Sequence, residues 1–504
     1  MSSCTRRTAH LRLALTPKRE ELSLFALLAL ICFDLLVRAL HTPLNTDELM
    51  ARISAQSANL QTVLTLLRRE PLNVDPPLFP IVSFLFAHLS VPVDLAVRIP
   101  SILGMCIAAA ALFGVVRDWL GFGVALIAAE LLASSPHAEY GAMARPYSLL
   151  IAALAAALLS WHRAAQARVN RRFWIVLLGI STEAAMLLHY YAAFGIVPIV
   201  LGELVRSAVR RAIDWAVWTS LAAAALVAAP IYAAFLPAGA IYRAHPFHPL
   251  SAGDLGLTFL NSLNYPVALT ALGVAVTLRF VFRDPGRVDG LRPYQWVVAS
   301  AFALSPLLVF STAGLASNTF RVWHAMYMII GVAILVGAAI YYAAGGNRTA
   351  LLGALFISLI VDQIGYIDLA RQPAFSPSSQ WAGENPDLLN RYPHLDLVSP
   401  DFDFAMRTHL YGPAWLSSRL IMITSRESML RFAGNDNAAL AALAIHRWTG
   451  WPLTDYFQFR RTHTQFLLYG EYWMYNALKS EGAQIELLGW VGPYRLYLVN
   501  APKL

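Results

Sequence analysis

The stretch "LFALLALICFDLLVRALHTPLNTDEL" (residues 24–49) joins a long apolar run to two adjacent carboxylates, Asp47 and Glu48. An apolar segment of about 20 residues can cross the hydrocarbon core of a bilayer as a helix. The run ends at Pro43, and the acidic pair follows almost at once. The chain therefore places two ionisable groups at the mouth of its first predicted membrane helix.

Similar apolar runs recur along the chain, which has 504 residues, 58% of them hydrophobic and 13% charged. Soluble proteins have about a quarter of their residues charged. We therefore predict a polytopic α-helical membrane protein with about 11 spans. The predicted spans cover residues 23–40, 98–116, 121–136, 146–161, 173–190, 194–206, 213–236, 266–282, 294–312, 322–343 and 350–367. The run 76–89 is short and broken by prolines, so it is a crossing or an interfacial helix.

The basic residues orient this arrangement. If 76–89 does not cross, most Lys and Arg that precede the C-terminal part and lie outside the predicted spans fall on the side of the N-terminus, mainly in segment 1–22 and in clusters at 163–172, 206–211 and 279–292. The positive-inside rule then makes the N-terminus cytoplasmic. The net charge of +8 is explained in this way, without a nucleic-acid partner. We expect a bacterial inner (cell) membrane protein whose first helix is retained rather than cleaved.

The domain organisation follows from this topology. Segment 1–22 is predicted to be cytoplasmic, and 23–368 forms the transmembrane domain, with a first outer loop at 41–97 that contains interfacial helices. Residues 369–504 are mixed polar and aromatic, and short runs such as "RLIMITS" and "NAALAALAIHRW" are typical of strands and helices. We predict a small extracytoplasmic α/β domain there.

Several polar residues are predicted to share the outer level of Asp47 and Glu48. Arg98 ("VRIPSILG"), Arg145 ("MARPYSLL") and Arg321 ("SNTFRVWH") open predicted spans, and His189, Tyr190 and Tyr191 ("HYYAAF") end one. Guanidinium groups bind phosphate through paired hydrogen bonds, and a carboxylate can accept a proton from an attacking hydroxyl. This set favours a site for a phosphate-bearing substrate.

Each residue also has a structural alternative. The arginines can extend to lipid headgroups, and Tyr190 and Tyr191 can belong to the interfacial aromatic belt. Asp47 and Glu48 can instead be first-turn residues of a helix that Asn45 or Thr46 caps, where the helix dipole stabilises their negative charge. No His, Cys and Asp cluster has metal-ligand spacing, so we expect metal-independent chemistry without a cofactor.

The ordered motifs resemble those of membrane glycosyltransferases with the GT-C fold, in particular bacterial relatives of protein O-mannosyltransferases and aminoarabinose transferases (family 39-like). The resemblance rests on "DE", "DPPLFP", "RIPSILG", "ARPYSLL" and "HYYAAF", and it covers residues 41 to about 205. It implies inverting transfer of a hexosyl or pentosyl group from a polyprenyl-phosphate donor to a cell-envelope acceptor, which could be a glycolipid, a polysaccharide or a protein. It also implies that Asp47, beside Glu48, is the base and that Arg98, Arg145 and Arg321 bind the lipid phosphate.

The chain departs from this family at two positions. A basic residue or histidine often precedes "PPL", whereas this chain has Asp75, which could act as a second acid. Met143 stands where the family commonly has a glutamate, two residues before the arginine of "ARPY". Two other classes stay open: a transporter or flippase of a lipid-linked or anionic solute, and a non-catalytic scaffold.

Overall fold

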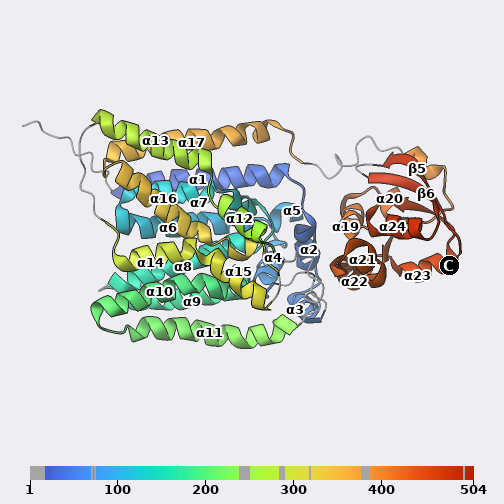
Figure 1. The fold of residues 1–504 in the computed structure, drawn as a ribbon, viewed down its shortest axis with the longest axis horizontal. Coiled ribbons are helices and arrows are strands. Elements are labelled where there is room, and N and C mark those ends of the chain that lie inside the picture. Colours follow the sequence, from blue (N-terminus) through green and yellow to red (C-terminus); the bar gives the residue numbers. More distant parts are fainter. Residues whose placement is uncertain are drawn as a thin grey trace, which may run out of the picture.

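The structure is a computed structural model that describes residues 17–69, 72, 75–166, 169–237, 250–282, 290–316, 319–375, 386–491 and 494–503. Most of the predicted segment 1–22 lies outside these residues. The described chain forms a helical bundle and a smaller α/β domain, which lies at one end of the bundle (Figure 1).

The bundle consists of long apolar helices with mostly buried contact faces. Its helices are α1 (Pro17–His41), α6 (Ile99–Leu120), α7 (Phe122–Ala133), α8 (Tyr147–Gln166), α9 (Arg171–Leu188), α10 (Ala192–Arg210), α11 (Trp215–Phe235), α12 (Ala252–Leu260), α13 (Tyr265–Phe282), α14 (Pro293–Ala303), α15 (Ser305–Ala316), α16 (Met328–Ala343) and α17 (Arg348–Arg371). Two 3₁₀ segments, η1 (Pro136–Ala142) and η3 (Val322–Ala325), precede α8 and α16.

Each predicted span coincides with one of these helices or, for 294–312, with the pair α14 and α15, which are bent by 48°. By length and hydropathy, six described helices could cross a membrane, or seven if the bent pair is one span. The helices α7 and α16 are apolar but have only 12 and 16 residues. The prediction of a multi-pass helical protein is therefore confirmed, whereas the count of eleven spans is not.

The segment between α1 and α6 folds into short helices at the end of the bundle nearest the α/β domain (Figure 1). These are α2 (Thr46–Ala55), α3 (Leu60–Arg69), α4 (Leu78–Phe86) and α5 (Val93–Ala96). The run 76–89 contains only α4, whose nine residues span about 14 Å as a helix. Since the hydrocarbon core is about 30 Å thick, α4 is too short to cross it alone.

The C-terminal domain has one six-stranded sheet in the order β3-β2-β1-β4-β6-β5. The strands β1 to β4 are parallel, and β6 is antiparallel to both β4 and β5. The strands are β1 (Leu397–Ser399), β2 (Leu420–Thr424), β3 (Leu453–Asp455), β4 (Gln465–Tyr469), β5 (Gln484–Val491) and β6 (Tyr494–Asn500), and the helices are α18 (Pro386–Asn390), α19 (Phe402–Tyr411), α20 (Ala414–Ser417), α21 (Arg426–Ala433), α22 (Asn437–Thr449), α23 (Tyr456–Thr462) and α24 (Tyr472–Ser480). The predicted small α/β domain is therefore present.

The domain shares a hydrophobic core with the first loop. Leu44, Leu49 and Ile53, from the region of α2, belong to the same buried cluster as Leu397 and Phe404 of the domain. The opposite face of the sheet has a separate core of the domain's own residues. The helix α2 therefore connects the bundle to the α/β domain.

Candidate active site

Local sequence determines how α2 begins. The Asn45 side chain accepts a hydrogen bond from the Glu48 backbone N–H, while the Glu48 carboxylate accepts one from the Asn45 backbone N–H (3.0 Å each). This reciprocal pair is a capping box, and it satisfies two N–H groups that the helix leaves unpaired. The suggested cap at Asn45 is confirmed, and it fixes the directions of Asp47 and Glu48.

Glu48 and Arg98 form an ion pair in the protein interior, with exposed side-chain fractions of 1% and 2%. Arg98 donates from Nε and Nη2 to the two carboxylate oxygens, over 2.7 and 2.9 Å. It also donates to the backbone carbonyls of Ala39, Thr42 and Pro43. These five hydrogen bonds match the five N–H groups of a guanidinium. Arg98 is therefore fully engaged with the protein.

Asp47 points away from this pair and contacts a second arginine. Its Oδ2 lies 2.9 Å from Arg145 Nη1, and 48% of its side chain is exposed. Arg145 Nη2 donates to the Tyr147 hydroxyl over 2.7 Å. Asp47 is thus an accessible carboxylate beside a guanidinium, whereas its neighbour Glu48 is enclosed.

Asp75 completes an acidic pair around Arg145. The pKa of the Asp75 carboxyl is raised to about 6, chiefly by burial; Arg145 opposes this rise, and the nearby Asp47 carboxylate adds to it. The structure therefore brings together one guanidinium and two carboxyl groups from three separate segments: α2, the turn before α4, and the segment that leads into α8. A second negative charge is disfavoured at this point.

An aromatic wall adjoins this group. The ring of Tyr147 lies 5.6 Å from that of His189, and His189 lies 5.7 Å from Tyr191 and 6.1 Å from His324, measured between ring centroids. Tyr191 stacks on His324 at 4.4 Å with an interplanar angle of 13°. His189 therefore lies next to Tyr147, the hydrogen-bond partner of Arg145, and Tyr191 lies on the other side of His189.

The remaining predicted residues lie at the edge of this cluster. Arg321 pairs with Asp254 over 2.9 Å, and its guanidinium is 5.7 Å from the Trp323 ring centroid. Tyr190 packs edge-on against Tyr232 at 4.9 Å. Arg321 thus has an acidic partner of its own and does not share Asp47 with Arg145.

Sequence reasoning did not single out Tyr147, Tyr140, His324 or Asp254. Tyr147 follows Arg145 by two positions in "ARPY", and His324 follows Arg321 by three in "RVWH". Their closeness to two predicted site arginines is the signal that could have indicated them. Tyr140 packs edge-on against Tyr147 at 5.2 Å, and burial raises the pKa of its hydroxyl to about 12. No spacing in the sequence indicates Asp254, which reaches Arg321 only through the fold.

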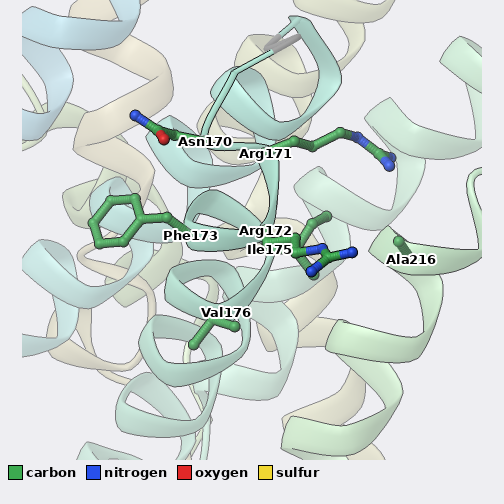
Figure 2. A pocket seen from close by; sticks show the side chains of 7 residues that line it. All are labelled: Asn170, Arg171, Arg172, Phe173, Ile175, Val176 and Ala216. Carbon is green, nitrogen blue, oxygen red and sulfur yellow. The ribbon is translucent and has the colours of Figure 1, made fainter.

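A hollow of about 860 Å³ lies elsewhere, between the start of α9 and α11 (Figure 2). Arg171 and Arg172 line it together with apolar side chains such as Phe173 and Val176. Arg171 is held there by Asp214. The helix α9 begins at this hollow and ends next to His189, so about 27 Å of helix separates it from the candidate site.

Within the part of the chain that the structure describes, no three His, Cys, Asp or Glu side chains are grouped so that they could hold a metal ion.

Solved structures share this architecture. ArnT from Cupriavidus metallidurans in the apo state has a TM-score of 0.57 and 16% identity, over 96% of this chain and 99% of that chain. The same protein bound to undecaprenyl phosphate has a TM-score of 0.56 and 14% identity, with the same coverage of both chains. The oligosaccharyltransferase of Archaeoglobus fulgidus has a TM-score of 0.50 and 11% identity, over 88% of this chain and 70% of that chain. The fold is therefore that of the GT-C membrane glycosyltransferases, as the motifs indicated.

The sequence comparison matches one segment of the chain to a known family. Residues 74–235 match the family described as dolichyl-phosphate-mannose-protein mannosyltransferase. No curated protein matches the chain significantly. The expected resemblance to GT-C enzymes related to protein mannosyltransferases is confirmed.

Proposed function

We propose that this protein transfers a sugar from a polyprenyl-phosphate donor to a hydroxyl of a cell-envelope acceptor, with inversion at the anomeric carbon. The observation that carries the proposal is the accessible Asp47 carboxylate, 2.9 Å from Arg145. The site lies at one end of a fold that it shares with a protein solved with undecaprenyl phosphate bound.

In the proposed reaction Asp47 is the general base. The acceptor oxygen attacks the anomeric carbon, its proton passes to Asp47, and the bond from that carbon to the phosphate oxygen breaks. The polyprenyl phosphate departs with an additional negative charge, which Arg145 stabilises. A guanidinium preorganised at the point where charge develops lowers the barrier of such a step.

We assign the predicted arginines different roles. Among the described residues, the Arg145 guanidinium has only the Asp47 carboxylate and the Tyr147 hydroxyl as hydrogen-bond or ion-pair partners, so a phosphate oxygen can share its charge. Arg321 is a second phosphate ligand, at the edge of the site. For Arg98 and Glu48 we propose a positioning role in place of the expected direct roles, because each satisfies the other and neither is accessible.

The other predicted residues form the surroundings of the reaction. Asp75 acts as a second acid that tunes the charge on Arg145. His189 and Tyr191 form, with His324, the wall against which the sugar or the first isoprene unit packs. Tyr190, which packs on Tyr232, supports this wall. In the proposed orientation, the site and the C-terminal domain face the outside of the inner membrane.

The test is release of polyprenyl phosphate from a panel of polyprenyl-phosphate sugars, with envelope extract as the acceptor source. Wild type, Asp47→Asn and Glu20→Gln would be compared in nanodiscs. Glu20 is a matched control, since it is ion-paired with Arg117 over 2.7 Å in the same bundle. We expect release by wild type and Glu20→Gln and not by Asp47→Asn. Equal release by all three would refute the role of Asp47, and release by none would favour transport or scaffolding.

A further inference from the structure

The helix α2, which carries Asp47, is packed between two hydrophobic cores. Ala51 and Ala55 belong to the core of the bundle. Leu49, Met50 and Ile53 belong to the core of the C-terminal domain. The direction of α2 therefore depends on both, and a displacement of the domain would displace the start of the helix.

Thr46 and Asp47 are adjacent, and they reach toward the two parts of the molecule. The Thr46 hydroxyl donates a 2.7 Å hydrogen bond to Asp403 Oδ1, on α19 of the C-terminal domain. The Asp47 carboxylate instead pairs with Arg145 of the bundle. Asp403 is itself oriented by Arg407, whose Nε donates to Oδ2 over 2.9 Å.

A second polar contact holds the far end of α2. Arg52 pairs with Asp94 over 2.9 Å, and Tyr411, at the end of α19, donates its hydroxyl to the same carboxylate over 2.9 Å. The guanidinium of Arg52 also lies 4.9 Å from the centroid of the Tyr411 ring. α19 therefore contacts α2 at its first residue and again about two turns later.

We propose that Asp403 is a positioning residue for the transfer reaction. It holds Thr46, and through Thr46 the first turn of α2, so that the Asp47 carboxylate faces the acceptor hydroxyl. The C-terminal domain is then part of the catalytic unit. This inference rests on the proposed function, because it requires Asp47 to be the base.

The sensitivity of a reaction to the position of its catalytic group gives the expected size of the effect on kcat. A misplacement of about 1 Å at a reacting centre can cost about 100-fold in rate. Loss of the contact between Thr46 and Asp403 should therefore lower kcat about 10- to 100-fold. Donor binding should not change, since Arg145 is not held by Asp403.

The experiment compares Thr46→Val, Asp403→Ala and the double variant in the full-length protein in nanodiscs. Val is nearly isosteric with Thr but has no hydroxyl, and Thr46→Ser keeps the hydroxyl. Glu471→Ala is the matched control, because Glu471 is ion-paired with Arg495 (2.6 Å) in the same domain and away from α2. The measurements are kcat, the dissociation constant of polyprenyl phosphate, and the melting temperature.

We expect kcat to fall in both single variants and to fall no further in the double variant. Thr46→Ser and Glu471→Ala should keep wild-type kcat, and all variants should bind polyprenyl phosphate like wild type. Unchanged kcat in both single variants, additive losses in the double variant, or losses that follow the melting temperature alone would each overturn the inference. Full activity of Asp47→Asn would overturn the proposed function itself, so the two failures are distinguishable.

Discussion

Glu48 and Arg98 are joined by two hydrogen bonds of 2.7 and 2.9 Å inside the protein, one residue away from an Asp47 carboxylate that is half exposed. The two neighbouring acids thus have opposite environments. The carboxylate oxygens of Glu48 accept two further hydrogen bonds, from the backbone N–H groups of Ala144 and Asn45. This arrangement holds four segments together: the end of α1, the start of α2, the start of α6 at Arg98, and the approach to α8.

Removal of the Glu48 carboxylate should destabilise the protein, because it breaks both the buried ion pair with Arg98 and the capping box at the start of α2. Breaking a buried ion pair costs about 3–5 kcal/mol, because the other charge is left without a partner. We expect Glu48→Ala to lower the melting temperature clearly in nanodiscs. Asp47→Asn is the control and should melt like wild type, since Asp47 is half exposed. Equal melting of wild type and Glu48→Ala would contradict a structural role for the pair.

Substitution of Arg145 should weaken donor binding. A hydrogen bond to a charged group contributes about 1.5–3 kcal/mol, so Arg145→Gln should raise the KM of the polyprenyl-phosphate sugar about 10- to 100-fold. The KM of Arg145→Lys should lie between those of wild type and Arg145→Gln, because lysine keeps the charge but not the paired N–H geometry. Arg98→Lys is the comparison variant. We expect it to destabilise the fold without a specific effect on KM, because Arg98 is buried and paired with Glu48. An unchanged KM in Arg145→Gln would remove Arg145 from the phosphate site.

Donor affinity should depend on pH through Asp75. The pKa of this carboxyl is raised to about 6, so Asp75 is mostly neutral at pH 5 and mostly ionised at pH 7. The ionised form repels a phosphate and partly neutralises Arg145, so the KM for donor should rise with pH. The Coulomb interaction of a phosphate with one nearby unit charge at an effective dielectric constant of about 40 should change the KM for donor about 3- to 10-fold.

Asp75→Asn supplies the control for this dependence. The variant carries no charge at either pH, so its KM should stay near the low-pH value of wild type throughout. The comparison is the ratio of KM at pH 7 to KM at pH 5 for both proteins. The same ratio in both would show that another group titrates.

The contact between α14 and α16 should not tolerate a methyl group at Gly331. A Cβ there would lie 2.3 Å from the Ala299 carbonyl oxygen and 2.4 Å from the Ala303 nitrogen, both of them backbone atoms that cannot move alone. Overpacking of this kind costs about 1–3 kcal/mol or more. We expect Gly331→Ala to lower the melting temperature. Gly273→Ala, in α13, is the matched control, because no atom lies within 4 Å of its Cβ position. It should melt at or above the wild-type temperature.

The sequence by itself determined the helical membrane architecture, the α/β character of the C-terminal part and most of the residues that gather around Arg145. These follow from apolar periodicity, capping signals and the ends of apolar runs, which are local properties of the chain. The sequence left open whether 76–89 crosses the membrane, and the structure places only the nine-residue α4 there. The span count was less certain, because helices such as α7 and α16 are apolar but short.

Only the tertiary structure decided which acid and which arginine are available to a substrate. Asp47 and Glu48 are adjacent, and Arg98 and Arg145 both open helices, so the sequence left both acids and both arginines as candidates. Their environments depend on contacts between residues 50 or more positions apart, such as Arg98 with Glu48 and the Ala144 backbone with Glu48. The bond between Thr46 and Asp403 joins residues 357 positions apart. Burial and pairing of charge are set by the packing of distant segments, and this packing is absent from any short stretch of sequence.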